Sequence, residues 1–368
     1  MDLVVTEEQR MLEQAARDFV AGRSSLKRAR AGAMSRELWK EMAALGWLGL
    51  LIPEEHGGSA LGYRYLMVVM EQLGRGLMPE PMLSTVVLGA GAILLGGSSS
   101  QRALLPSVAK GETLLSLAYQ EPHSRWSLTA IETTADARGG VFVLRGEKSH
   151  VMGGVAADHF VVSAQHGGGL GLFVVPAKAK GVHVEALHRL DGRDAATLKL
   201  EGVEVGANAA LGAPDGAQWI LERVIDAGAI ALSAEMLGSM NAALSMTLEY
   251  LKTRVQFGVP IGSFQALQHR AARMYAETEL ARSAVMYAHA LLDERAPASE
   301  IARAACVAKA KCSEAGMLVA HEAVQMHGGI GMTDEHDVGL FLKRARVAEM
   351  TFGDAAFYRD RFARLGGY

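Results

Sequence analysis

Two short strings in the last third of the sequence bring together side chains that can bind a phosphate-bearing ligand. The first string, residues 250–268, reads YLKTRVQFGVPIGSFQALQ, and the second, residues 325–332, reads QMHGGIGM. Together they supply an arginine, aromatic rings, amide side chains and a glycine pair within otherwise helical sequence. An arginine fork can bind pyrophosphate, and an aromatic ring can lie against a purine. The combination therefore indicates a site for an extended phosphate-bearing cofactor.

Each string also has a purely structural interpretation. Arg254 falls at the end of a predicted helix, where a cation interacts favourably with the helix dipole. The glycines and proline that follow it interrupt the helix and force irregular backbone. Gly328 and Gly329, taken alone, would be an ordinary helix C-cap. Only the occurrence of both strings in one chain favours ligand binding.

Residues 1–111 carry a predominantly helical pattern. Thr6 with Gln9 three residues later forms a capping box, and Ser35 precedes an amphipathic run that ends near Gly46. The segment IPEEHGGSALG that follows is dense in turn residues and predicts a loop. Further helices are predicted at residues 63–73, 86–95 and 102–109.

The pattern changes to short strands after Gly111. Alternating or continuously apolar runs predict β-strands, and glycines between them predict hairpin turns at Gly139-Gly140 and at residues 166–169. Residues 112–216 should therefore form a small β-barrel or sandwich. The predicted strands are residues 114–118, 141–144, 159–163, 170–175, 182–186 and 197–200.

Residues 217–368 return to a helical period. Leu237, Met240, Leu244, Leu248 and Leu251 recur every three or four residues, as one face of an α-helix requires. Long helices are also predicted at residues 267–292 and 299–326, and the abundant Ala and Met favour a tightly packed antiparallel bundle. The predicted fold is α+β, with an N-terminal helical domain (1–111), a central small β-barrel domain (112–216) and a C-terminal four-helix-bundle domain (217–368).

The composition excludes some classes of partner. With 37 Lys and Arg against 40 Asp and Glu the net charge is −3, so a basic face for nucleic acid is not expected. Apolar runs are interrupted before about 18 residues, so no membrane span is expected, and no signal peptide is expected before Thr6. Cys306 and Cys312, six residues apart on a predicted helix, favour buried thiols over a disulfide, and a cytoplasmic protein. A small molecule is the expected partner.

Three histidines raise the question of a metal site. His321, His327 and His336 are separated by six and nine residues, which matches neither an i, i+4 pair on one helix nor the usual zinc arrangements. We therefore expect no metal, and assign these histidines to helix-end and surface roles.

The chain resembles the acyl-CoA dehydrogenase family of flavin enzymes along essentially its whole length. Gln325, Gly328, Gly329 and Gly331 match the family's Gln-x-x-Gly-Gly-x-Gly motif, and the first string is similar to its helical cofactor motif. The segments TEEQRML, LWKEMAALGWLGLLIPEEHGG and EQLGRGL are also similar to family segments, and the α, β, α order matches its fold. Within the family, the likeness is greatest to the small subunit of pimeloyl-CoA dehydrogenase and related heteromeric enzymes.

The resemblance implies that FAD is the cofactor and that its ADP part is contacted across a subunit boundary, which requires an oligomer. The isoalloxazine would lie near residues 119–122 and the KSHVMGG run that begins at Lys148. The resemblance assigns the ADP part to Arg254, Phe257, Ile261, Phe264, Gln265, Gln325, Gly328 and Gly329, and further cofactor contacts to Tyr119, Gln120, Val151, Met152 and Asp354.

One departure from the family pattern concerns the flavin-facing loop. The usual Thr-Glu-Pro-Gly-x-Gly-Ser-Asp segment is here QEPHSRWS, residues 120–127, without the glycines that let flavin and thioester approach the backbone. His123 and Arg125 could meet acidic groups or be plain exposed loop residues. Flavin or acyl-CoA binding by this chain's own β-domain is thus left open.

A second departure concerns the general base. Many family members carry a glutamate before a glycine where this chain has Phe352-Gly353, and another branch carries it at the position of Gly228. Neither Phe352 nor Gly228 can accept a proton. Asp226 is the candidate base, because burial on the apolar, glycine-flanked helix IDAGAIAL would make a carboxylate more basic. The alternative is a solvated or salt-bridged aspartate beside Arg223.

The activity that the resemblance implies is FAD-dependent α,β-dehydrogenation of an acyl-CoA thioester, with α-proton abstraction and β-hydride transfer to flavin N5. Electrons would pass to an acceptor such as electron-transfer flavoprotein, as in fatty acid β-oxidation. Either the chain forms a homo-oligomer, such as a tetramer, and uses Asp226, or it is a catalytically impaired subunit of a heterotetramer that clamps FAD for a homologous partner. Oxidation of another substrate class and a non-redox acyl-CoA-binding protein are the remaining alternatives. The sequence does not specify the length or shape of the acyl group.

Overall fold

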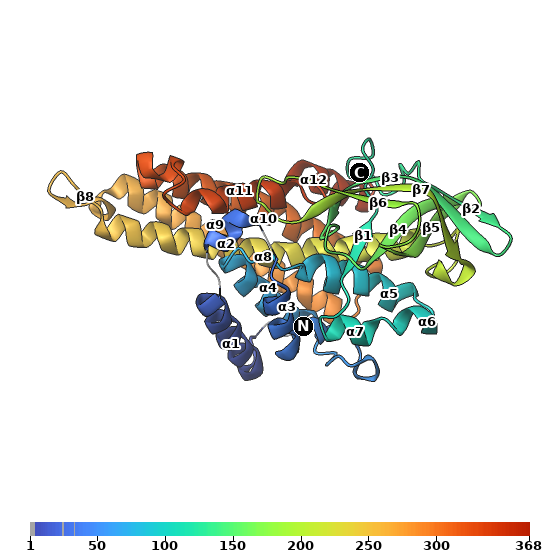
Figure 1. Ribbon diagram of the computed structural model, residues 1–368. Helices are drawn as coiled ribbons and strands as arrows, with labels where there is room; N and C mark the ends of the chain where they lie inside the picture. The colour runs from blue at the N-terminus through green and yellow to red at the C-terminus, as the bar shows by residue number, and fades with distance from the viewer. Residues whose placement is uncertain (1–3, 24–25, 33) are drawn as a thin grey trace. The chain divides into compact units, whose positions relative to one another are not determined.

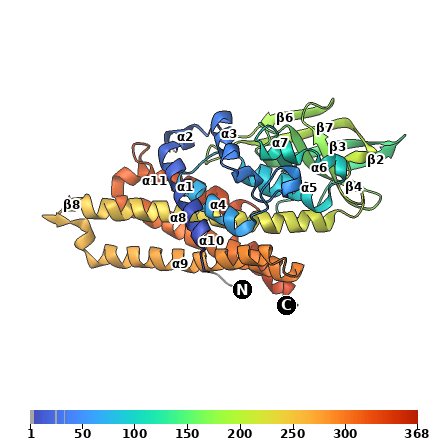
Figure 2. The same cartoon turned by 90° about the horizontal axis from the view of Figure 1, so that it is seen from below.

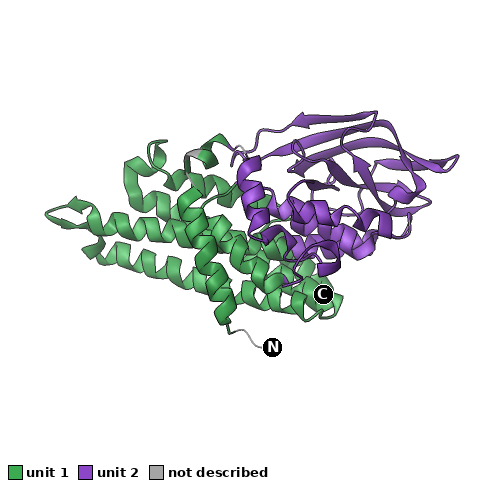
Figure 3. Cartoon of the chain, turned by 60° about the horizontal axis from the view of Figure 1, so that its bottom comes forward, with its two compact units in different colours: residues 1–31, 63–78, 229–368 green, residues 32–62, 79–228 purple. Residues whose placement is uncertain are grey.

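The computed structural model describes residues 4–23, 26–32 and 34–368 and divides into two compact units, coloured in Figure 3. The bundle unit comprises residues 1–31, 63–78 and 229–368, and the sheet unit comprises residues 32–62 and 79–228. The division falls within one helix, α8 (Gln218–Thr253). The division into three domains at residues 111 and 216 stays a prediction, because the helices of the first 111 residues are shared between the two units.

Long helices make up the bundle unit (Figures 1 and 2). The three long helices predicted from the apolar period are confirmed as α8, α9 (Gln265–Asp293) and α10 (Ala298–His327). α11 (Val338–Met350) and α12 (Ala355–Leu365) pack against α10. The remaining helices of the unit are α1 (Glu7–Arg23), α2 (Leu26–Ala31) and α4 (Tyr63–Arg75).

Side-chain caps begin two of the helices as predicted. At α1, the Thr6 N–H donates to the Gln9 side chain over 3.0 Å, and the Gln9 N–H donates to Thr6 Oγ1 over 3.2 Å. At α3 (Arg36–Ala44) in the sheet unit, Ser35 Oγ accepts a hydrogen bond from the Leu38 N–H over 3.2 Å. Each bond satisfies a backbone donor that has no partner inside its helix.

Two predicted helices of the sheet unit are each divided into two segments. The predicted helix at residues 86–95 begins as a π-helix, η3 (Leu83–Gly89), and continues as α5 (Ala90–Gly96). The predicted helix at residues 102–109 is split into α6 (Ser99–Arg102) and α7 (Leu105–Ala109). Pro106 lies in the first turn of α7, a position that favours the start of a helix. Short 3₁₀ turns complete the helical segments: η1 (Trp47–Gly49), η2 (Glu54–His56) and η4 (Ala207–Ala209).

A seven-stranded sheet forms the core of the sheet unit, in the order β1-β4-β2-β3-β7-β6 with β5 also paired to β4. Both predicted hairpin turns are confirmed: Gly139-Gly140 joins β2 to β3, and Gly167-Gly168 joins β4 to β5. All four glycines have positive φ, as a type I′ turn requires. The strands are β1 (Leu115–Ala118), β2 (Thr134–Arg138), β3 (Val141–Met152), β4 (His159–His166), β5 (Gly169–Pro176), β6 (Val182–Ala186) and β7 (Ala195–Gly206).

Within the seven-stranded sheet, β2 is the strand that the sequence pattern did not predict. Its residues TADAR expose every side chain except Ala135, so they show no apolar alternation. Pairing with β3 through the glycine turn, rather than burial, defines this strand. None of the helices in the described part of the chain combines the length and apolar character that crossing a membrane demands.

Candidate functional site

The two strings lie at the same end of the bundle unit. α8 ends at Thr253 and α9 begins at Gln265, and the chain between them forms the small hairpin of β8 (Val255–Gln256) and β9 (Val259–Pro260), at the left of Figure 1, and the 3₁₀ turn η5 (Ile261–Ser263). Tyr250, in the last turn of α8, stacks on His327 at the end of α10, with 4.5 Å between ring centroids and 28° between ring planes. We call the two strings together the ligand clamp.

Apart from the half-buried Tyr250, the aromatic and basic side chains of the first string are exposed. The Phe257 ring is 90% exposed, and the Phe264 ring packs edge-on against it with centroids 6.1 Å apart. Arg254 and Gln265 are also exposed, and Ile261 is half-buried. Because the Phe257 ring is almost fully exposed, it adds little to the core and is available to a ligand or a partner chain.

The second string presents open backbone. Gly328 ends α10 with a φ of 65°, and η6 (Gly328–Met332) follows. A Cβ at Gly328 or Gly329 would meet no atom within 4 Å, whereas one at Gly331 would come within 2.6 Å of the Val324 carbonyl oxygen. Gln325 is exposed beside them. Gly331 is thus needed for packing, while Gly328 and Gly329 leave room for a ligand to approach the backbone.

The predicted flavin-facing segments of the sheet unit contain a buried ion pair. Glu121 Oε1 accepts a hydrogen bond from Lys148 Nζ over 2.6 Å, and the same ammonium donates to Ser163 Oγ over 3.0 Å. Burial lowers the pKa of Lys148 to about 8 despite the adjacent carboxylate. For Glu121, burial opposes the charged form, but the Lys148 charge and the hydrogen bonds outweigh it and lower the pKa. Of the predicted contacts here, Tyr119 and Val151 are buried, and Gln120 and Met152 are half-buried.

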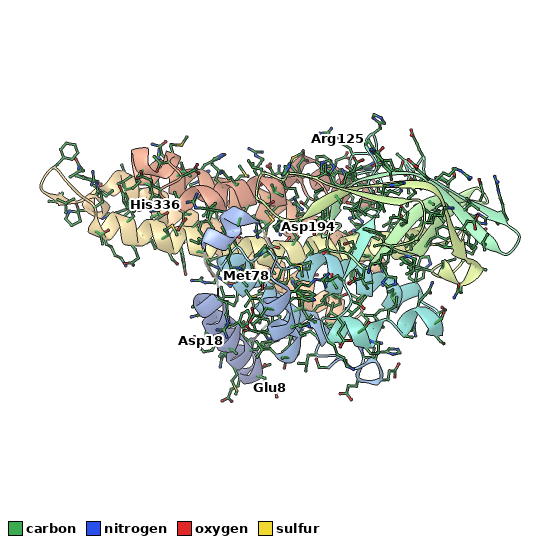
Figure 4. The ribbon with its side chains drawn as sticks, in the orientation of Figure 1. Glu8, Asp18, Met78, Arg125, Asp194 and His336 are labelled. Carbon is green, nitrogen blue, oxygen red and sulfur yellow. The ribbon has the colours of Figure 1, made fainter. Side chains whose placement is uncertain are left out.

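The loop that departs from the family pattern is exposed at its two basic residues. His123 and Arg125 both face solvent, and the Arg125 guanidinium lies over the Trp126 ring, 4.7 Å from its centroid. Arg125 has a positive φ of 49° and is labelled in Figure 4. Both are thus exposed loop residues, and a contact with acidic groups of a ligand stays a prediction.

The first position expected for a general base is closed to solvent. Phe352 follows α11 with a φ of 63° and is only 4% exposed. The nearest carboxylate in sequence, Asp354, accepts a hydrogen bond from the Phe357 N–H over 2.8 Å and so caps α12. The structure thus gives Asp354 a helix-capping role, and its predicted contact with a cofactor stays a prediction.

A buried lysine holds the turn that contains Phe352. Lys309 Nζ donates to Ser313 Oγ, to the Glu349 carbonyl and to the Gly353 carbonyl over 3.0, 2.9 and 2.8 Å. Burial lowers the pKa of Lys309 to about 7. Sequence reasoning missed Lys309, because two of its three acceptors, the Glu349 and Gly353 carbonyls, lie 40 and 44 residues further along the chain.

The second base position lies within α8. Gly228 is buried on that helix, and Asp226, two residues before it, is 3% exposed. The solvated alternative for Asp226 is therefore wrong, because its carboxylate is removed from water. The structure places Asp226 at a buried position of α8. Its catalytic role and the salt-bridged alternative beside Arg223 both stay predictions.

A cavity in the bundle unit has a charged wall that the sequence did not reveal. Arg344 Nη1 donates to Glu235 Oε1 over 3.0 Å, and both residues line a small pocket between α8, α10 and α11. Most of the other lining residues are apolar or small, among them Met236 and Gly316. The two charged partners are 109 residues apart in the chain, so no local pattern pairs them.

The remaining candidate ligands for a metal are dispersed. Cys306 and Cys312 are buried thiols on α10, as expected. Over residues 4–23, 26–32 and 34–368, no three His, Cys, Asp or Glu side chains are grouped as metal ligands would be.

Known proteins share both the sequence and the fold of this chain. Three family models match it: acyl-CoA dehydrogenase N-terminal domain at residues 6–112, middle domain at 116–203 and C-terminal domain at 214–365. The probable acyl-CoA dehydrogenase YngJ of Bacillus subtilis is 30% identical over 99% of each chain.

Two solved structures superpose on the whole chain. The butyryl-CoA dehydrogenase of Megasphaera elsdenii has a TM-score of 0.93 at 26% identity and covers 99% of each chain. The ChsE4-ChsE5 complex of Mycobacterium tuberculosis has a TM-score of 0.90 at 29% identity, covering 99% of this chain and 98% of that one. The chain belongs to the acyl-CoA dehydrogenase family.

Proposed function

We propose that the chain serves the FAD-dependent α,β-dehydrogenation of an acyl-CoA thioester as one subunit of an oligomer. The observation that carries this proposal is the ligand clamp, in which the Tyr250–His327 stack joins the exposed first string to the open glycine backbone of the second. Membership of the acyl-CoA dehydrogenase family supports the same reaction class. FAD, when bound, would accept the hydride from the substrate's β-carbon.

The residues of the clamp fit the ADP half of FAD. The Arg254 guanidinium is exposed and suits a pyrophosphate, and the exposed Phe257 and Phe264 rings suit an adenine face. Backbone at Gly328 and Gly329 is unobstructed, so a phosphate could approach it closely. Gln265, Gln325 and Ile261 would complete the contacts. Since the clamp is exposed in a single chain, we propose that it acts on a cofactor held mainly by a neighbouring subunit.

A second version of the proposal is favoured by the two base positions. A buried Phe352 ring and the helical Gly228 stand where family members carry a glutamate, so this chain would clamp FAD for a homologous partner that has the base. The ChsE4-ChsE5 complex, to which the chain is similar, is by its name an assembly of two different proteins. In this version, Asp226 has no catalytic part. An acceptor such as electron-transfer flavoprotein, a role in fatty acid β-oxidation and a cytoplasmic location belong to the proposal in either version.

Co-expression with a homologous acyl-CoA dehydrogenase tests both versions. We expect Arg254→Ala to lower the flavin content of the purified oligomer severalfold, and Arg273→Ala, an exposed arginine on α9, to leave it unchanged. Flavin absorbance and its anaerobic bleaching by acyl-CoA thioesters are the measurements. Flavin-containing, active protein from this chain alone would refute the second version, and an oligomer without flavin would refute the redox function and leave acyl-CoA binding.

A further inference from the structure

Three rings connect the parts of the ligand clamp. His327 stacks on Tyr250 of α8 on one side, and its ring centroid lies 4.4 Å from that of His336, which precedes α11 and is labelled in Figure 4. Tyr250 and His336 are themselves 6.3 Å apart, edge to face. The glycine turn of residues 328–332 runs between the two histidines in the chain, so its position depends on these contacts.

Hydrogen bonding specifies a neutral His327. Its Nδ1 lies 2.7 Å from the Ala323 carbonyl oxygen, which can only accept, so Nδ1 carries the proton. Its Nε2 is buried and has no hydrogen-bond partner among the described residues, and His327 is 2% exposed. Burial lowers the pKa of His327, the Ala323 carbonyl opposes that change, and His336 adds to it. A second proton on this ring would therefore be buried without an acceptor.

His336 makes a different hydrogen bond, in which its ring nitrogen is the acceptor. Its Nδ1 accepts a hydrogen bond from the Val338 N–H over 3.1 Å, at the first residue of α11. Protonation of Nδ1 would break this bond and place a cation at the positive end of the helix dipole. Both rings thus make their contacts in the neutral form.

The other charges around the pair do not stabilise a protonated pair. Asp337 and Asp334, on the loop before α11, already face cations: Arg30 of α2 contacts both carboxylates, and Lys343 of α11 lies 3.8 Å from Asp334. Glu335 on the same loop is exposed. From α8, the Tyr250 ring faces both histidines.

We propose that His327 and His336 are positioning residues of the ligand clamp: as neutral rings they hold the glycine turn against Tyr250, and protonation of both releases the turn. The part that concerns the cofactor rests on the proposed function. Two like charges about 4 Å apart repel strongly in a partly buried site. Because folding lowers the pKa of His327 below the ordinary value of 6.5, its contribution to the closed turn is present above about pH 6.5 and is lost as the pH falls through the lowered value.

Hydrogen exchange of the full chain, measured at residues 328–337, tests the proposed release of the glycine turn without any cofactor. After correction for intrinsic exchange rates, we expect exchange to accelerate at least about tenfold between about pH 8 and pH 5 in the wild type, and this acceleration to be absent in His327→Phe, which keeps a ring to stack. His289→Phe is the matched control and should keep the acceleration. Like His327, His289 is buried and its Nδ1 lies 2.8 Å from the carbonyl oxygen four residues before it, that of Val285, but it stacks on no second histidine in the described chain. No acceleration in the wild type, or an equal acceleration in His327→Phe, would overturn the proposal.

Two further measurements keep the result interpretable. If His327→Phe does not fold, His336→Asn replaces it, because asparagine can still accept from the Val338 N–H without adding a charge; the acceleration must then be lost in that variant. Flavin release from the co-expressed oligomer is followed by fluorescence over the same pH range, and should parallel exchange in each variant. If the oligomer lacks flavin but exchange changes with pH as expected, the proposed function is refuted and the release of the glycine turn is not. If flavin release is the same in the wild type and in both variants, the role in cofactor retention is refuted.

Discussion

Arg344 and Glu235 form a buried ion pair that ties α11 to α8, with 3.0 Å between Nη1 and Oε1 and side chains that are 3% and 7% exposed. The same guanidinium donates through Nη2 to the Leu77 carbonyl, just beyond α4, over 3.1 Å. One arginine therefore holds three helical segments of the bundle unit. Removing one partner of a buried ion pair destabilises the fold strongly, whereas replacing both partners by apolar residues of similar size destabilises it much less.

Replacing one partner of this pair should be more harmful than replacing both. We expect Arg344→Met to lower the free energy of unfolding by about 3–5 kcal/mol, because it leaves the Glu235 carboxylate buried without its cation. Glu235→Leu combined with Arg344→Met should restore much of the loss. Urea denaturation of the four proteins of the double-mutant cycle measures the coupling, and purely additive losses would contradict it.

The Glu121–Lys148 pair should make the stability of the sheet unit depend on acid. The folded pKa of Glu121 is lowered from 4.5, so its stabilising contribution is present above about pH 4.5 and is lost as the pH falls through the folded value. Glu121→Gln should remove this part of the pH dependence and cost about 3–5 kcal/mol at neutral pH, since Lys148 remains buried. Glu132→Gln, at an exposed position, is the control. Chemical denaturation from neutral to acid pH measures the loss of stability and its pH dependence. If the free energy of unfolding fell with pH by the same amount in the wild type and in Glu121→Gln, the predicted contribution of Glu121 would be wrong.

Two glycines inside helices of the bundle unit should respond to alanine with opposite signs. A Cβ at Gly316 of α10 would meet only the flexible Met236 methyl group, at 3.5 Å, so Gly316→Ala should stabilise by about 0.5–1 kcal/mol through helix propensity. A Cβ at Gly238 of α8 would come within 1.8 Å of the Glu71 carbonyl oxygen on α4, so Gly238→Ala should destabilise by about 1–3 kcal/mol or more. Thermal melting of both variants is the test. If both substitutions changed the melting temperature in the same direction, the helix packing around these glycines would differ from the contacts described.

Asp226→Asn tests the candidate base. If Asp226 accepts the α-proton, turnover should fall about 10²- to 10⁴-fold with flavin content retained, because asparagine keeps the shape of the side chain and cannot take a proton. Glu222→Gln, one turn earlier on α8, is the control and should leave turnover unchanged. Single-turnover flavin reduction by an acyl-CoA thioester is the measurement, and an unchanged rate in Asp226→Asn would leave the base to a partner subunit.

Local sequence patterns predicted much of the fold. The apolar period of α8, the capping box of Thr6 with Gln9 and the glycine pair at Gly139-Gly140 each act over a few residues, so they can be read without knowing the rest of the chain. The strand β2 could not be read in this way, because pairing with β3 and not its own polar residues forms it. The π-helix at residues 83–89 was missed for a related reason. An apolar run does not distinguish the i to i+5 hydrogen bonds of a π-helix from the i to i+4 bonds of an α-helix.

The sequence by itself determined which residues could form the ligand clamp and that Phe352 and Gly228 cannot act as bases, because both conclusions depend on side-chain chemistry alone. Only the tertiary structure decided that Tyr250 stacks on His327, 77 positions further along the chain, and that Lys148 meets Glu121 in a buried pair. Such contacts depend on where helices end and how strands register. These are properties of the whole packed unit, and residues far apart in the chain carry no local signal of them.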